Sequence, residues 1–142
     1  DKHRPLQQRA YADAEHVISA FRSYQDFNVQ VFSSPAKRAL TTAELFKNQL
    51  NIADDNFESI SQLYTFNAND VLNFIKSIED KHDNVMMFGH NPAFTEVVNY
   101  LGSMSFDNLP TTGLVCITFE IHSWSQLQRG DTQLYLFPKH LR

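Results

Sequence analysis

Cysteine, glycine, basic residues and long apolar runs are all scarce in this chain of 142 residues. A single cysteine, Cys116, excludes an internal disulfide and is typical of a reducing compartment such as the cytoplasm. Only 4 glycines and 5 prolines exclude a fibrous or low-complexity chain. No apolar stretch approaches the roughly 20 residues that a membrane span needs. Lys and Arg number 12 against 16 Asp and Glu, and this net charge of −4 disfavours a nucleic-acid partner.

Apolar and aromatic residues, by contrast, are abundant. Hydrophobic residues make up 42% of the chain and phenylalanine alone occurs 12 times, so we expect one domain with an aromatic-rich core. Helices are predicted over 6–24, 35–50, 67–79 and 92–101, and strands over 29–32, 84–88, 114–121 and 132–137, with a further short strand within 58–64. This order predicts an α/β three-layer sandwich. Its sheet is mixed and mostly parallel, with helices on both faces and a C-terminal β hairpin.

Two matching turns connect a predicted strand to a predicted helix. One turn contains Ser34 followed by Pro35, and the other contains His90 and Asn91 followed by Pro92. Polar residues before proline are typical of helix starts, so Ser34 is expected mainly to cap its helix and secondarily to lie beside a bound anion. Helix starts present N–H groups and the positive end of the helix dipole, so backbone donors near Ser34 and Asn91 favour phosphate binding.

Arg38 and His90 add charge to these turns. Arg38 lies three residues after Pro35 and supplies a permanent fork of donors, while His90 supplies a titratable imidazole. Because ligands of α/β sheets gather at strand ends, we expect the two side chains to hold one tetrahedral anion. Arg4 is assigned either to the entrance of this pocket or to the surface.

The order of several short motifs resembles that of the histidine phosphatase superfamily, and most closely its small SixA-type branch, the phosphohistidine phosphatases. The motifs are Arg4-Pro5-Leu6, Ser33-Ser34-Pro35-x-x-Arg38, Leu63-Tyr64, Gly89-His90-Asn91-Pro92 and Pro110-Thr111-Thr112. The resemblance implies that a histidine attacks phosphorus and becomes phosphorylated, and that water then releases phosphate. It also implies that Arg38 clamps the phosphoryl oxygens and that His90 is the second histidine. No metal or other cofactor is implied.

The chain departs from that pattern near its start, because the Arg-His-Gly motif that carries the nucleophile is absent. We therefore expect residues 1–142 to form a single histidine-phosphatase-like domain without its nucleophile strand, which would precede Asp1. The alternative is a non-catalytic module that binds phosphate or a phosphoprotein.

The predicted activity is a metal-independent phosphatase acting on phosphohistidine in a protein, with a phosphorylated His-containing signalling protein as substrate. The chain has no long insertion to enclose a small metabolite, which favours a protein substrate. The alternative within the superfamily is a phosphomonoesterase or mutase for small metabolites, which needs an acid to protonate an alkoxide leaving group. Glu44, Glu58 and Glu96 are the candidate acids, and the sequence does not choose among them or define an oligomeric state.

Overall fold

A computed structural model describes residues 2–24 and 28–142, and it contains every predicted helix and strand with ends moved by a few residues. The helices are α1 (Gln8–Arg22), α2 (Lys37–Gln49), α3 (Ala68–Lys76) and α4 (Ala93–Leu101); the strands are β1 (Gln30–Ser33), β2 (Phe57–Ser59), β3 (Val85–Phe88), β4 (Leu114–Thr118) and β5 (Asp131–Leu136). In the described part of the chain the short 3₁₀ turns η1 (Asp54–Asn56), η2 (Ser61–Leu63) and η3 (Trp124–Gln126) lie in the connections, and η4 (Pro138–His140) follows β5. Within the described residues no helix combines the length and apolar character that crossing a lipid bilayer demands.

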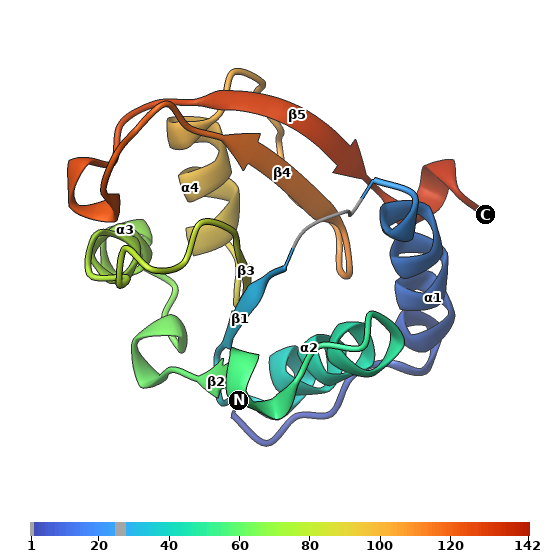
Figure 1. Cartoon of the computed structure of the whole chain (residues 1–142). Helices are drawn as coiled ribbons and strands as arrows, with labels where there is room; N and C mark the ends of the chain where they lie inside the picture. Colours follow the sequence, from blue (N-terminus) through green and yellow to red (C-terminus); the bar gives the residue numbers. More distant parts are fainter. Residues whose placement is uncertain (1, 25–27) are drawn as a thin grey trace.

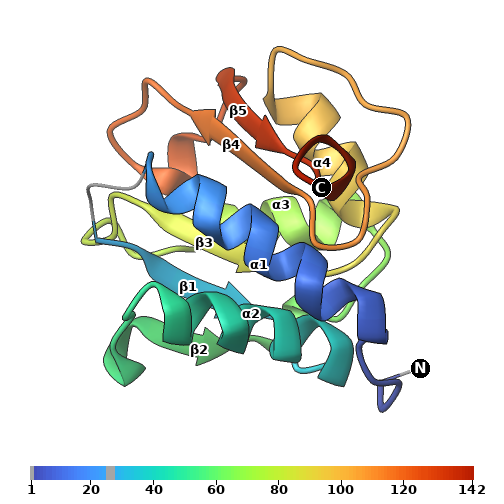
Figure 2. The same cartoon turned by 90° about the vertical axis from the view of Figure 1, so that its right-hand side faces the viewer.

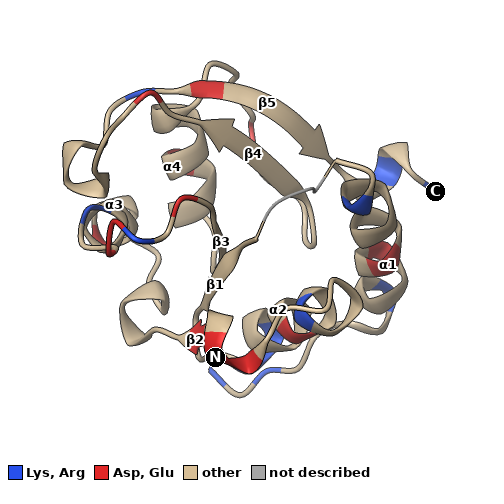
Figure 3. Cartoon of the chain, viewed as in Figure 1, with Lys and Arg blue, Asp and Glu red and all other residues tan. Residues whose placement is uncertain are grey.

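The first three strands form a parallel sheet in the order β2-β1-β3. The central strand β1 is buried along its whole length and pairs with β3 from Gln30 opposite Val85 to Ser33 opposite Phe88. Strands β4 and β5 form the predicted antiparallel hairpin, with a bulge between Cys116 and Ile117. Strands β1, β3 and β4 carry no charged residue, as Figure 3 shows, which fits their position between layers of helices.

The helices cover both faces of the strands, as predicted (Figure 1). Strand β3 shows this directly, because alternate side chains of a strand point to opposite faces. Val85 and Met87 pack against the core cluster that includes residues of α3 and α4, whereas Met86 and Phe88 pack against the cluster that includes residues of α1 and α2. The strands therefore form the middle layer of three.

The prediction of one mixed sheet is wrong for the residues that the structure describes. They form two sheets, because β4 pairs with β5 and not with β3. Figure 2 nevertheless shows the strands following one another in the order β2, β1, β3, β4, β5. An apolar, β-branched run indicates a buried strand, but it does not specify the neighbouring strand, which depends on tertiary placement. The facing edges of β3 and β4 thus lie at the junction of the two sheets.

The predicted start of α3 is confirmed, whereas α2 and α4 begin later than predicted. Asn67 caps α3 as predicted, since its Oδ1 accepts a hydrogen bond from the Asn69 N–H at 2.8 Å. Helix α2 begins later than predicted, with Ala36 at the N-cap position and no side-chain cap. Ser34 is therefore not the cap of α2; its Oγ accepts the Ala36 N–H at 3.2 Å, in the turn before the helix. Pro92 occupies the N-cap of α4, one position before the helix rather than its first residue.

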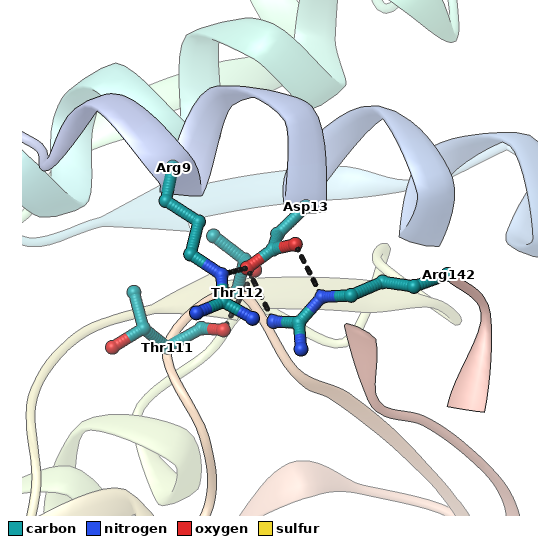
Figure 4. A network of polar contacts seen from close by, with 5 residues as sticks. All are labelled: Arg9, Asp13, Thr111, Thr112 and Arg142. Atoms are coloured by element: carbon teal, nitrogen blue, oxygen red, sulfur yellow. Dashed lines mark hydrogen bonds and ion pairs between the residues drawn. The ribbon is translucent and has the colours of Figure 1, made fainter. Parts of the chain in front are cut away.

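Helix α1 is held to the C-terminal segment by an ion pair. Asp13, whose side chain is 12% exposed, accepts hydrogen bonds from Nε and Nη2 of Arg142 at 3.1 and 3.0 Å. Arg9 lies on the other side of the carboxylate, with Nε 3.7 Å from Oδ2, and Figure 4 shows Thr111 and Thr112 beside this group. The hydrogen bonds from Arg142 hold the pKa of Asp13 below its ordinary value.

Candidate functional site

The candidate site lies where β1 and β3 end. These strands are parallel neighbours, so their carboxyl ends meet at one edge of the sheet. Ser34 follows β1 and donates its backbone N–H to the carbonyl of Phe88 at 2.9 Å, and Gly89 and His90 follow Phe88 directly. A Cβ on Gly89 would collide with the ring of Phe94, so a larger residue at this point requires that ring to move. The turn after β3 is thereby held close against the turn after β1.

The structure brings together three of the predicted site residues. His90 is buried, with 6% of its surface exposed, and both of its ring nitrogens have partners. Nδ1 of His90 lies 3.2 Å from Nη2 of Arg38, and Nε2 lies 2.8 Å from Oγ of Ser34. A guanidinium only donates hydrogen bonds, so Nδ1 is the acceptor and the ring proton of neutral His90 is on Nε2. His90 consequently donates to Ser34.

Burial and charge keep this imidazole neutral. Burial lowers the pKa of His90, and the positive charge of Arg38 lowers it further, to about 4. An incoming anion reverses this influence, because negative charge beside an imidazole favours its protonated form. The site therefore contains a permanent cation and a second group that can acquire positive charge when an anion binds.

Ser34 and Asn91 are engaged with the protein in this structure. The hydroxyl of Ser34 contacts His90 and accepts the Ala36 N–H, and its own backbone N–H is used by Phe88. The amide of Asn91 donates to the carbonyl of Leu109 at 2.9 Å, and its oxygen accepts from the N–H and the hydroxyl of Thr95 at 3.1 and 2.8 Å. Asn91 thus fixes the turn after β3 to α4 and to the loop before β4.

Two aromatic rings that the sequence analysis did not assign to the site lie against His90. Tyr64 and Phe66 make edge-to-face contacts with the imidazole, with ring centroids 5.5 and 5.9 Å away. Both rings are accessible, Tyr64 at 37% and Phe66 at 54%. The signal available in the sequence was a pair of aromatic residues in a polar loop just before the cap of α3, where a core role is not expected.

A surface cavity of about 520 Å³ is lined in part by Phe66 and is called the Glu96 cavity below. Its lining residues come from the loop before α3, the start of α3 and the first turn of α4: Thr65, Phe66, Asn67, Ala68, Asn69 and Glu96. Of the three candidate acids, Glu96 is the one in this lining; Glu44 is exposed on α2 and Glu58 is exposed on β2. Arg4 is also exposed.

The fold defined by these elements is the one seen in structures of SixA-type phosphohistidine phosphatases. A structure of the protein histidine phosphatase SixA complexed with tungstate matches with a TM-score of 0.82 at 19% identity, covering 100% of this chain and 89% of that one. A protein assigned as phosphohistidine phosphatase SixA from Nakamurella multipartitia matches with a TM-score of 0.81 at 17% identity, over 97% and 87% of the two chains.

A third structure, assigned as SixA from Agrobacterium tumefaciens, matches with a TM-score of 0.72 at 23% identity, over 96% of this chain and 85% of that one. No protein-family model and no curated protein sequence matches. The similarity thus lies in the fold. At this sequence identity it does not establish the activity, which has to be argued from the site.

Proposed function

We propose that this chain carries the phosphoryl-binding part of a metal-independent phosphatase that removes phosphate from phosphohistidine in a protein. The observation that carries the proposal is the hydrogen-bonded set of Arg38, His90 and Ser34 at the carboxyl ends of β1 and β3. The guanidinium has a planar fork of donors that matches two oxygens of a tetrahedral anion. Catalysis of phosphoryl transfer depends mainly on such positioning and charge stabilisation.

In this proposal each residue has a separate part in the reaction. A histidine from outside residues 1–142 forms the new bond to phosphorus while the bond to the substrate imidazole breaks, and water then cleaves the phosphoenzyme. Arg38 holds the phosphoryl oxygens through both steps. His90 gains positive charge as the anion approaches and stabilises the transferring group, while Ser34 keeps its ring in position.

The junction between the two sheets supports a place for the missing nucleophile. All four residues of β3 are half-buried, although the neighbouring β1 is buried throughout, and residues 114–117 of β4 are also half-buried and apolar. Within the described residues the facing edges of β3 and β4 have no partner strand. A strand between them would satisfy both edges and cover these side chains. If it were parallel to β3, it would end beside His90.

The substrate proposed is a phosphorylated His-containing signalling protein. Phosphohistidine has an imidazole leaving group, which needs less help from an acid than an alkoxide does. The single cysteine favours a cytoplasmic setting for such a protein. We add no metal or cofactor to the proposal, since Arg38 and a protonated His90 supply the positive charge.

Two other functions have an observation in their favour. Glu96 lines the cavity beside His90, and an acid in this position would suit a phosphomonoesterase or mutase of small metabolites. The absence of an Arg-His-Gly motif favours a non-catalytic module that binds phosphate or a phosphoprotein.

Binding of tungstate, the tetrahedral oxyanion present in the SixA structure, tests the phosphoryl site on the 142-residue chain. Calorimetry is expected to show binding that Arg38→Ala weakens at least about tenfold, because a charge-assisted bidentate contact contributes more than about 1.4 kcal/mol. Lys76→Ala, which removes an exposed cation at the end of α3, is the matched control and should bind normally. Equal weakening in both variants, or no binding to the parent chain, would contradict the proposal.

A further inference from the structure

The Glu96 cavity has a charge opposite to that of the neighbouring anion site. Glu96 is the only charged residue in its lining, and no basic side chain in the described part of the chain forms an ion pair with it. A carboxylate repels a phosphoryl group, so this cavity is suited to a different part of the substrate. Its volume of about 520 Å³ is ample for one amino-acid side chain.

Exposed aromatic rings connect the two regions. Phe66 belongs to the lining of the cavity and also contacts the His90 imidazole, so this one ring joins the cavity to the Arg38–His90 site. Tyr64, which lies in the same loop before α3 as Phe66, contacts the same imidazole. Accessible aromatic faces beside a carboxylate are a favourable surface for a cation, because the ring quadrupole and the carboxylate both attract positive charge.

We propose that the Glu96 cavity receives a basic side chain of the substrate polypeptide, a Lys or Arg next to the phosphorylated histidine. This inference rests on the proposed function and specifies its substrate class. The phosphoryl group lies at Arg38 and His90, the polypeptide passes over Tyr64 and Phe66, and the cation enters the cavity to pair with Glu96. Consecutive residues of an extended chain are about 3.3 Å apart, which suits a flanking residue. Glu96 is then a specificity-determining residue.

Two peptides test this inference on the 142-residue chain without requiring turnover. Both carry a phosphonate analogue of phosphohistidine; one has Lys on each side of it, and the other has norleucine, which keeps the carbon stem and lacks the charge. Fluorescence anisotropy measures each dissociation constant at low salt. The parent chain is expected to bind the Lys peptide about fivefold more tightly, an effect typical of an exposed carboxylate combined with a cation–π contact.

Variants of Glu96 assign this preference to the cavity. Glu96→Gln should bring the two affinities within about twofold, and Glu96→Lys should make the norleucine peptide the tighter ligand. Glu15→Gln, which neutralises an exposed carboxylate on α1, should keep the fivefold preference and controls for net charge. Equal binding of both peptides by the parent chain, or a preference that persists in Glu96→Gln, would overturn the inference.

The same experiment separates this inference from the proposed function. A Lys peptide without the phosphonate should bind more weakly than the same peptide with it. Equal affinity of these two peptides would contradict the phosphoryl site. The ratio of the dissociation constants of the Lys and norleucine peptides would still report on the cavity. A role for Glu96 as proton donor predicts a different result. In a turnover assay on the full-length protein, Glu96→Gln would then slow phosphate release from Lys and norleucine substrates by the same factor and leave their KM ratio unchanged, and that outcome would refute cation recognition.

Discussion

The guanidinium of Arg38 hydrogen-bonds the imidazole of His90, with Nη2 3.2 Å from Nδ1. Because the guanidinium can only donate, this contact assigns the lone pair of His90 to Nδ1 and its proton to Nε2, which faces Ser34. The contact also places a permanent cation beside a group that can be protonated, in a partly buried position. Burial and the positive charge of Arg38 both lower the pKa of His90, so the ring is neutral near neutral pH.

The first prediction concerns the titration of His90 in the empty site. NMR of the imidazole nitrogens should show a neutral ring with the proton on Nε2 near neutral pH and a pKa of about 4. Arg38→Ala should raise the pKa of His90, because one of the charges that disfavours protonation is removed, while burial still keeps it below its ordinary value. A His90 pKa at its ordinary value in the parent chain would contradict this description of the site.

The second prediction concerns how anion binding depends on pH. Sulfate should bind more tightly as the pH falls from about 7 to about 5, by about tenfold, because the bound anion favours the imidazolium form of His90. Sulfate stays a dianion over this range, so its own titration does not contribute. His90→Asn should remove most of this pH dependence in a calorimetric titration. Binding that is independent of pH in the parent chain would show that His90 does not take up a proton with the anion.

The sequence alone predicted the helices and strands and the proximity of Arg38 to His90, because both follow from local patterns of residues. Polar residues after a buried strand and before a helix mark a strand end, and parallel neighbours bring such ends together. It was not sufficient for the aromatic rings of Tyr64 and Phe66, whose contacts with His90 depend on how the loop before α3 is placed. The role of Ser34 was also misjudged, because helix α2 starts after an extended Ala36. The position of the β3 and β4 edges, which have no partner strand within the described residues, likewise required three-dimensional information.

The third prediction concerns Gly89, which precedes His90. Gly89→Ala should lower the free energy of unfolding by about 1–3 kcal/mol, because the added methyl group collides with the ring of Phe94. Urea unfolding measures the change, and Ser105→Ala, at an exposed position, should stay within about 0.5 kcal/mol of the parent chain. A Gly89→Ala variant of parental stability would show that the turn after β3 has room to adjust.

The fourth prediction concerns the ion pair of Asp13 with Arg142. Asp13→Asn should lower the free energy of unfolding by about 1 kcal/mol near neutral pH, a modest value because Arg142 is partly exposed. The pKa of Asp13 is lowered in the folded chain, so its contribution is complete above the ordinary pKa of a carboxyl group and is lost as the pH falls through the folded value. The difference between the two proteins should therefore shrink below about pH 4. Glu15→Gln on the same helix is the control, and a difference that stays constant with pH would argue against the ion pair.

The central claim is that the Arg38–His90 site serves the dephosphorylation of a protein-bound phosphohistidine. Its most direct test is phosphate release from a phosphorylated His-containing signalling domain and from sugar phosphates by the full-length protein. We predict a kcat/KM at least about tenfold higher on the signalling domain, and a loss of more than about 100-fold in Arg38→Ala, equivalent to about 3 kcal/mol of transition-state stabilisation. Equal or faster release from the sugar phosphates, or a rate that survives Arg38→Ala within a few-fold, would contradict the claim.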